Sequence, residues 1–384
     1  MVNQSSTRAG KYIPQPDGYS TFIPAKFPPN PPIEVNKAMQ SALSHADYAL
    51  EFLNGAIKTL PEPQLFVMMY VRQEALMSSR IEGTQSSLQE ILDAEAQLFG
   101  NAYQSDAFEV INYIAATQTG LEQIEHAQIT TSLIKELHHI LLQNTRGSRH
   151  TPGHLRTKQV WIGPPQCQIH EAYFVPPPPD QVQLHLQELD RFIVTNQDLP
   201  ILVKIGLVHA QFETIHPFTD GNGRIGRLIL TLMLCKSEVL QRPVLYLSRF
   251  FNRHRSEYYE KLQSVRDEGK WEEWLLFFLR GVEEVSKHSA RTAQRILAMR
   301  EQDRDTINKN LRRAAVNGHL LLDRLYTFPA VGVNEVQKLI NVSYTTANTL
   351  VRRMVDMGLL REYTGYARNK RYILHRYVEL FDDM

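Results

Sequence analysis

The sequence predicts a mainly helical protein that ends in a smaller module of mixed helices and strands. Most of the chain falls into stretches in which apolar side chains recur every three or four positions, the spacing of an amphipathic helix. Two segments depart from this spacing, residues 147–179 and the residues beyond about 320. The first is rich in Gly, Pro, Val, Trp and Ile and predicts a short β-hairpin or an irregular pair of strands. The second predicts two short helices followed by two strands.

Length and composition limit the class of protein. The 384 residues allow two or three domains, and 43% hydrophobic with 22% charged residues is a globular balance rather than a disordered one. Two cysteines exclude a disulfide scaffold and argue against a structural zinc site. The N-terminus lacks the apolar core of a secretory signal, and the longest apolar runs are too short to cross a bilayer. We therefore expect a cytoplasmic protein without membrane contact.

Charge is distributed unevenly along the chain. The 42 basic and 41 acidic residues give a net charge of +1, but residues 286–384 contain 17 basic and 10 acidic side chains. The rest of the chain is therefore acidic. This asymmetry predicts a basic module attached to an acidic body.

The elements follow in order from the N-terminus. Seven prolines in residues 12–32 predict an extended arm, because proline blocks helix formation. Helical spacing begins near residue 34. Gly83 is placed to end a helix over 64–81, and Ser87 with Glu90 forms a capping box for the next one. The other expected helices cover residues 107–125, 129–142, 180–195, 200–215, about 224–238, 256–267 and 271–302.

The densest group of reactive side chains is HPFTDGNGRIGR at residues 216–227. Glycines at 221 and 223 allow successive backbone N–H groups to turn inward as an anion-binding nest, beside the positive end of the following helix. Arg224 and Arg227 share one helix face and suit two phosphates. The carboxylate of Asp220 suits Mg²⁺. His216 suits a general base, because its ordinary pKa lies near neutrality.

Two other interpretations of this loop were weighed. The letters GNGRIG at 221–226 match GxGxxG, but a dinucleotide site requires a preceding strand, and residues 202–212 predict a helix. A purely structural loop is the second interpretation. Twelve residues that combine a base, a carboxylate, two glycines and two arginines make it the weaker one.

The loop resembles the Fic motif, HPFx(D/E)GNGRxxR, at every defined position. Further similarity extends over roughly residues 10–285, through Gly153-x-x-Arg156 and through Tyr246, Asn252 and Tyr258 to Trp271 and Trp274. The resemblance implies a Fic-fold helical bundle with a small β-hairpin flap that positions the target. The flap residues are Val160, Trp161, Ile162 and Gly163.

The resemblance also implies an activity, the transfer of AMP from ATP to a hydroxyl of a target protein. His216 would deprotonate the target Ser, Thr or Tyr, and Asp220 would bind Mg²⁺ against the α- and β-phosphates. The remaining nucleotide contacts would come from the glycine turn, the two arginines and one downstream residue: Gly221, Asn222, Gly223, Arg224, Arg227 and Asn252.

Ser78, Glu82 and Gly83 match the Fic inhibitory pattern (S/T)xxxE(G/N). Without the Fic loop, Ser79 with Glu82 would be interpreted as an ordinary capping box. With it, Glu82 is expected to pair with Arg227 and to occupy the site of the γ-phosphate. Some relatives use such a glutamate to remove AMP, so this second activity stays open.

The segment from residue 320 resembles a winged helix-turn-helix, with short helices over 336–340 and 345–357 and a wing over 358–374. DNA contact would come from the second helix and the wing, through Thr345, Thr346, Arg352, Arg353, Arg368, Lys370 and Arg371. A module used only for protein contact or dimerisation is the alternative.

We therefore expect four segments: residues 1–105 with the arm and inhibitory helix, 106–285 as catalytic core, 286–319 as connecting helix, and 320–384 as winged helix-turn-helix. The expected partners are ATP with Mg²⁺, a hydroxyl-bearing target protein and DNA, with a homodimer left open. The alternatives are a DNA-binding regulator that senses nucleotide, and a Fic enzyme that removes AMP or moves a different group.

Overall fold

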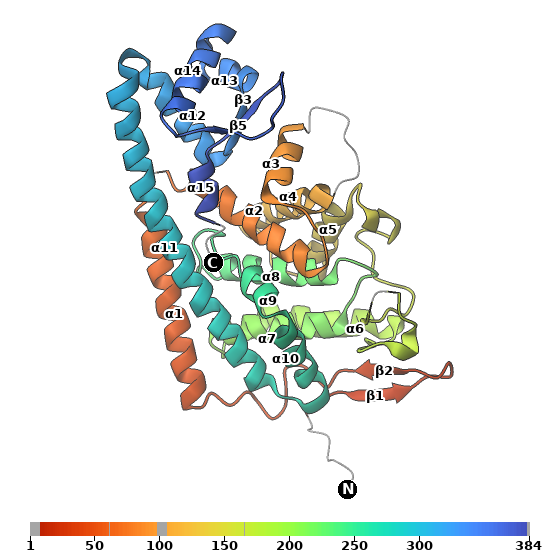
Figure 1. The fold of residues 1–384 in the computed structure, drawn as a ribbon. Helices are drawn as coiled ribbons and strands as arrows, with labels where there is room; N and C mark the ends of the chain where they lie inside the picture. Colours follow the sequence, from red (N-terminus) through yellow and green to blue (C-terminus); the bar gives the residue numbers. More distant parts are fainter. Residues whose placement is uncertain (1–7, 61, 98–105, 165, 382–384) are drawn as a thin grey trace.

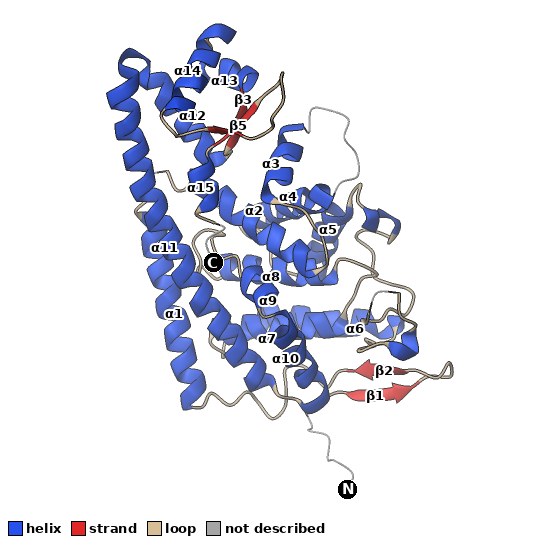
Figure 2. Ribbon diagram, viewed as in Figure 1, coloured by secondary structure: helices blue, strands red, loops and turns tan. Residues whose placement is uncertain are grey.

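The computed structural model describes residues 8–60, 62–97, 106–164 and 166–381, and the structural statements below concern these ranges. Within them the chain consists mainly of helices, and its named strands occur at two places, near the N-terminus and near the C-terminus (Figures 1 and 2). The mainly helical fold class is confirmed. Within the same ranges, no helix combines the length and the apolar character needed to cross a bilayer.

Two buried helices form the centre of the fold, α7 (Ile201–Ile215) and α8 (Asn222–Lys236). Both are apolar around most of their circumference, which is typical of helices enclosed by others. The helices that pack against one or both of them are α2 (Gln64–Ile81), α4 (Asp106–Ile124), α5 (Thr131–Leu142), α6 (Pro179–Thr195), α10 (Arg255–Glu268) and α11 (Trp271–Leu311). Because a helix precedes the 216–227 loop, the dinucleotide-binding interpretation is excluded.

On the outside, α1 (Lys37–Lys58) lies along α11 (Figure 1). The short helix α3 (Leu88–Gln97) follows α2 after a turn, and α9 (Ser248–Arg253) lies between α2 and α11. The predicted span of α2 is confirmed, and Gly83 follows it with φ +96°. The capping box of α3 is confirmed as well, because Ser87 and Glu90 exchange two N–H bonds of 2.8 and 3.2 Å.

Two regions lie outside the regular helices. The N-terminal arm is a hairpin of β1 (Lys11–Pro14) and β2 (Ser20–Ile23), which turns at Gly18 with φ +82°. Of the two forms expected within 147–179, the structure shows the irregular strand pair rather than a regular hairpin. This segment contains the short 3-10 helices η1 (Arg146–Arg149) and η2 (Ile169–Glu171) and one isolated antiparallel bridge between Ile162 and Phe174. Prolines on both sides of the bridge lack the N–H that a longer ladder needs.

The predicted boundary at residue 286 lies inside a continuous helix. α11 runs on to Leu311, because buried Ile296, Ile307 and Leu311 continue its apolar face. A short 3-10 segment, η3 (Arg312–Ala314), then leads into α12 (Ala315–Thr327). The segment 286–319 is therefore the outer half of a long helix and the start of the next one rather than a separate connector.

The C-terminal module contains the expected helix pair, α13 (Val333–Ile340) and α14 (Tyr344–Asp356), on either side of residues 341–343. Three short strands form an antiparallel sheet in the order β3-β5-β4: β3 (Ala330–Gly332), β4 (Arg361–Glu362) and β5 (Arg371–Ile373). A last helix, α15 (His375–Glu379), was not predicted. We call α12 to α15 with this sheet the C-terminal module.

Candidate active site

The loop between α7 and α8 is held in one shape by its own residues. His216 ends α7 with φ +48°, and Gly221 precedes α8 with φ +76°. The left-handed region costs glycine little but strains a histidine, so the surroundings must hold His216 in place. The buried Asn222 side chain accepts the Phe218 N–H and donates to the Phe218 carbonyl, both at 2.8 Å. The Asn222 side chain thus stabilises the loop. Of Asn222, only the backbone N–H remains for the anion contact predicted from the sequence.

A buried histidine on α5 supports the loop from the other side. The His138 ring stacks on Phe218 with centroids 3.7 Å apart and an interplanar angle of 8°. Its Nδ1 accepts the Gly153 N–H at 2.9 Å, so the ring proton lies on Nε2, which donates to the Asp220 carbonyl at 2.9 Å. Burial is the main reason that the pKa of His138 falls to about 4. The ring therefore stays neutral and keeps both hydrogen bonds at physiological pH.

Arg156 anchors the loop from the segment that precedes the flap. Its side chain is 2% exposed. It donates to the carbonyls of His216 at 2.8 Å, Pro177 at 2.6 Å and Ile215 at 3.3 Å. A guanidinium bonded to three backbone carbonyls fixes the left-handed turn at His216 and ties the flap segment to it.

We expect Arg156→Ala to lower the free energy of unfolding by about 3 kcal/mol, because three buried carbonyls lose a charged donor. Urea denaturation measures this loss. Arg156→Lys should recover part of it, and Lys158→Ala, two residues away and exposed, serves as the control. Equal midpoints for Arg156→Ala and Lys158→Ala would contradict the anchoring role.

The His216 imidazole is held in its neutral form. Burial, followed by the positive charges of Arg156 and Arg266, lowers its pKa to about 3. Its Nδ1 is buried and forms no hydrogen bond within the described residues. A neutral imidazole with a free ring nitrogen is the form that accepts a proton.

We expect the ring signals of His216 to show no titration between about pH 5 and pH 8, because the neutral form of a base predominates at all pH values above its pKa. Carbon–proton correlation spectra of histidine-labelled protein measure this, and the signal missing from His216→Ala identifies the ring. A midpoint near the ordinary histidine value of 6.5 would contradict the environment described here.

Asp220 is the carboxylate of the loop, and its side chain is 43% exposed. Oδ1 accepts the Gly221 N–H at 2.7 Å and lies 3.7 Å from Nη2 of Arg224. Oδ2 faces Gly147, where an added Cβ would lie 3.0 Å from it. Oδ1 is thus held by the loop itself, and Oδ2 lies close to the backbone of Gly147.

Arg224 is buried and already paired. Its Nη1 donates to Glu109 of α4 at 3.1 Å. The hydroxyl of Thr84, in the turn after α2, donates to the same Glu109 oxygen at 3.1 Å. Through this shared Glu109 oxygen, hydrogen bonds connect Arg224 to α4 and to the turn that follows Glu82.

Arg227 is bound to the end of α2. Its Nη2 donates to the Glu82 carboxylate at 2.7 Å and to the Ser78 carbonyl at 2.9 Å, and its Nε donates to the Ser78 hydroxyl at 2.9 Å. Burial opposes the charged form of Glu82, but the charge and hydrogen bond of Arg227 outweigh it and lower the pKa of Glu82. The same carboxylate raises the pKa of Arg227 further above its ordinary range, against the effect of burial.

The Glu82 carboxylate also lies over the first turn of α8. A Cβ added at Gly223 would come within 2.2 Å of Glu82 Oε1, so only glycine allows this approach. The first turn of a helix carries unpaired N–H groups and the positive end of the helix dipole. The carboxylate thus occupies the place that the sequence predicts for a phosphate.

The other predicted residues fall into three groups. Val160, Trp161, Ile162 and Gly163 lie in the bridge segment, where Ile162 exchanges backbone hydrogen bonds of 2.8 and 3.1 Å with Phe174. Asn252 lies on α9 and is partly buried, and its nucleotide contact stays a prediction. Tyr258 is buried and bonded through its hydroxyl to His209 at 2.8 Å, so it belongs to the core.

Sequence reasoning missed the residues that hold the predicted ones in place. His138 and Glu109 were not singled out, and Arg156 was only part of a pattern. Helical spacing could have indicated one further residue, Glu74. It precedes Ser78 and Glu82 at four-residue spacing and so lies on the same helix face. Glu74 is buried and accepts from the backbone N–H of Ser248 at 3.0 Å.

Comparisons with known proteins identify relatives for the helical part of the chain. Residues 40–122 match the Fic/DOC family N-terminal profile, and residues 128–234 match the Fic/DOC family profile. Over 185 residues, 48% of this chain, it is 29% identical to a protein adenylyltransferase, fic-1, of Caenorhabditis elegans. Over 194 residues, 50% of this chain, it is 26% identical to a probable protein adenylyltransferase of Aquifex aeolicus. These matches span 32% and 55% of the two relatives' own lengths.

The fold has a counterpart among solved structures. A crystal structure of a Fic family protein from Desulfovibrio desulfuricans covers 89% of this chain and 97% of its own, with a TM-score of 0.54 and 17% sequence identity. At that identity the likeness concerns the fold alone. The profile matches cover α2, α4, α5, α7 and most of α8, the helices that carry the site. The chain therefore contains a Fic/DOC family N-terminal region at residues 40–122 and a Fic/DOC family domain at residues 128–234.

Proposed function

We propose that this protein transfers AMP from ATP to a hydroxyl group of a target protein, and of itself, and that Glu82 inhibits the transfer. The observation that carries the proposal is the arrangement around α8. A neutral histidine lies at one end of the loop, and an arginine fork and a helix N-terminus lie at the other, where a carboxylate takes the place of a phosphate. The two relatives, a protein adenylyltransferase and a probable protein adenylyltransferase, support the same reaction.

In this reaction His216 accepts the proton of the target hydroxyl, and the hydroxyl oxygen forms a bond to the α-phosphorus of ATP. The bond between the α-phosphorus and the bridging oxygen breaks, and pyrophosphate leaves. The backbone of residues 221–223 would hold the α-phosphate, and Arg224 and Arg227 would hold the β- and γ-phosphates. Such transfer depends mainly on positioning and charge stabilisation, which these groups provide.

The residues fit Mg²⁺ as it is bound together with nucleotides. Within the described part of the chain no three His, Cys, Asp or Glu side chains gather as a metal site. Mg²⁺ usually takes one or two carboxylates and completes its shell with water and phosphate oxygens. Oδ2 of Asp220, which faces Gly147, would hold it, and the ion would supply positive charge to the phosphates.

Inhibition follows from competition for Arg227. The γ-phosphate and the Glu82 carboxylate need the same guanidinium fork and the same helix end. ATP that binds while Glu82 remains paired would place its phosphates differently from a productive arrangement. Because Thr84 and Glu109 connect the same turn to Arg224, movement of Glu82 also affects the second arginine.

Incubation of the purified chain with α-labelled ATP and Mg²⁺, followed by intact-mass analysis, tests the proposal. A mass increase of one AMP group per modified chain is expected, weak in the native sequence and strong when Glu82 is replaced. Addition of a phosphate or of another part of the nucleotide would assign a different transfer reaction to the site.

A further inference from the structure

The C-terminal module has no part in the proposed transfer, and a large groove lies on its surface. The groove has a volume of about 1030 Å³ and separates α14 from residues 366–370, the loop between β4 and β5. We call it the wing groove. Its polar and aromatic lining comes from Tyr344, Asn348 and Arg352 of α14 and from Tyr366, Arg368 and Lys370 of the loop.

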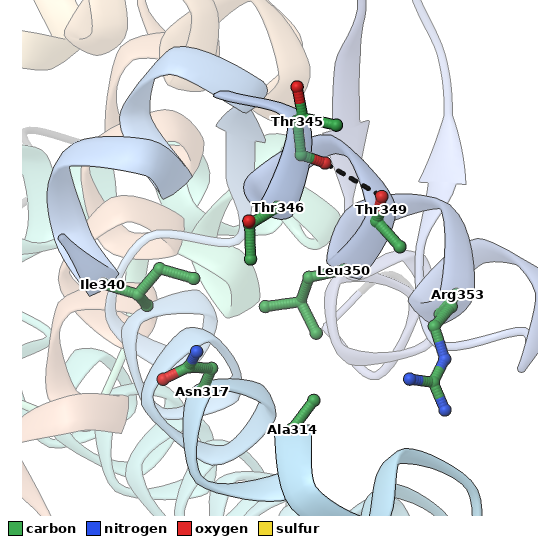
Figure 3. Close-up of a pocket in the computed structure, with 8 residues that line it drawn as sticks. All are labelled: Ala314, Asn317, Ile340, Thr345, Thr346, Thr349, Leu350 and Arg353. Atoms are coloured by element: carbon green, nitrogen blue, oxygen red, sulfur yellow. Dashed lines mark hydrogen bonds between the residues drawn. The ribbon is translucent and has the colours of Figure 1, made fainter. Parts of the chain in front are cut away.

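The exposed side of α14 is polar and continuous with this groove. Ala347, Leu350, Val351 and Met354 are buried and attach the helix to the module. Thr345, Thr349 and Arg352 are exposed at four- and three-residue spacing, so they form one outward stripe. The Thr349 hydroxyl donates a hydrogen bond of 2.8 Å to the Thr345 carbonyl, drawn as a dashed line in Figure 3.

The seven residues predicted to bind DNA differ in whether their side chains already have partners within the fold. Arg353 donates to the Asn310 carbonyl of α11 and lines, together with Thr345 and Thr349, a smaller cavity of about 210 Å³ (Figure 3). Arg371 is paired with Glu335 at 2.9 Å and Asp93 at 3.4 Å. Both side chains already hold parts of the fold together, and their contact with DNA stays a prediction.

The N–H and the hydroxyl of Thr346 both form hydrogen bonds with Ser343, the residue that caps α14. Three cations remain available. Arg352, Arg368 and Lys370 are exposed and form no ion pair within 4 Å among the described residues.

The acidic side chains around the groove offset these charges only in part. Glu335 is held by Arg371. Glu362 accepts the N–H groups of Thr364 and Gly365, each at 2.8 Å, and so closes the turn of the wing. Asp356 is the remaining exposed carboxylate of the lining, at the far end of α14. The lining thus contains four cations and three carboxylates, and the wing groove carries a net charge of only +1.

We propose that the wing groove binds double-stranded DNA, with the outward stripe of α14 in the major groove and Arg368 and Lys370 against phosphates. An α-helix fits the major groove, which is about 12 Å wide. Asn348 and Arg352 are of the types that pair with adenine and guanine edges, and loop cations are typical phosphate contacts.

Fluorescence anisotropy of a labelled mixed-sequence duplex of about 25 base pairs, titrated with the full chain, tests this proposal. Two phosphate contacts, from Arg368 and Lys370, predict a slope of about −2 for log affinity against log salt. Replacement of Arg352, Arg368 and Lys370 by alanine should weaken binding at low salt by at least about tenfold and remove most of the slope. All three side chains are exposed, and circular dichroism verifies that the variant folds.

The matched control is Arg361→Ala, which removes an exposed cation of the same module outside the groove, where it pairs with Glu379 at 3.5 Å. It should bind DNA as the native chain does. No binding at low salt, or equal binding by the triple variant, would overturn the proposal, as would tighter binding of a duplex RNA of the same length. No nucleotide is added in this assay, so its result is independent of the proposed AMP transfer.

Discussion

Glu82→Gly is expected to raise self-modification with labelled ATP by about tenfold or more. The substitution removes the carboxylate that occupies the Arg227 fork and the N-terminus of α8. A charge-assisted hydrogen bond of this kind is worth about 1.5–3 kcal/mol, and each 1.4 kcal/mol corresponds to about a factor of ten. Because Glu82 follows the last residue of α2, the change leaves the helix itself intact.

Graded substitutions at the same position separate charge from shape. Glu82→Gln keeps the size of the side chain and a carbonyl acceptor but removes the charge, so its activity should lie between the native and glycine proteins. Incorporated label per chain, measured over time at fixed Mg-ATP, ranks the three. A folded Glu82→Gly protein that labels neither itself nor lysate proteins would falsify the proposed inhibition and, with it, the transfer reaction.

His216→Ala, introduced into the Glu82→Gly protein, is expected to lower the transfer rate by about 10²–10⁴, the usual contribution of a positioned general base. The affinity for Mg-ATP should change little, because the phosphates are assigned to α8 and its arginines rather than to the imidazole. Label incorporation measures the rate, and calorimetric titration with Mg-ATP measures binding.

An exposed histidine provides the control for this experiment. His126→Ala, in the turn after α4, should leave both rate and binding unchanged. Retention of full transfer by His216→Ala would assign the base to a different group. Loss of ATP binding together with transfer would mean that His216 shapes the loop rather than accepts a proton.

Features formed by neighbouring residues could be predicted from the sequence, whereas contacts between distant residues could not. The 216–227 loop was predictable because twelve neighbouring residues contain its chemistry. α2 was predictable to the residue because its spacing and Gly83 define both ends. The pairing of Glu82 with Arg227 joins positions 145 residues apart, and only the family resemblance indicated it.

The missed features depend on tertiary contacts. A single histidine on an amphipathic helix, such as His138, has no sequence pattern that indicates stacking on Phe218. Arg156 resembles an ordinary loop cation until its three carbonyl acceptors are seen. For the flap, the composition of residues 147–179 indicated a hairpin or an irregular strand pair without deciding between them, and the structure has a single antiparallel bridge.

The helix α2 is held at both of its ends. Near its start, Phe66 packs against Tyr326 of the C-terminal module with ring centroids 5.1 Å apart, and Arg72 donates to the Thr327 carbonyl at 2.8 Å. Beyond its last turn, Glu82 occupies Arg227. Contacts at two places on one helix can couple binding at the C-terminal module to binding at α8, and such coupling is reciprocal. If a ligand of the C-terminal module changes the affinity for ATP by some factor, ATP must change the affinity for that ligand by the same factor.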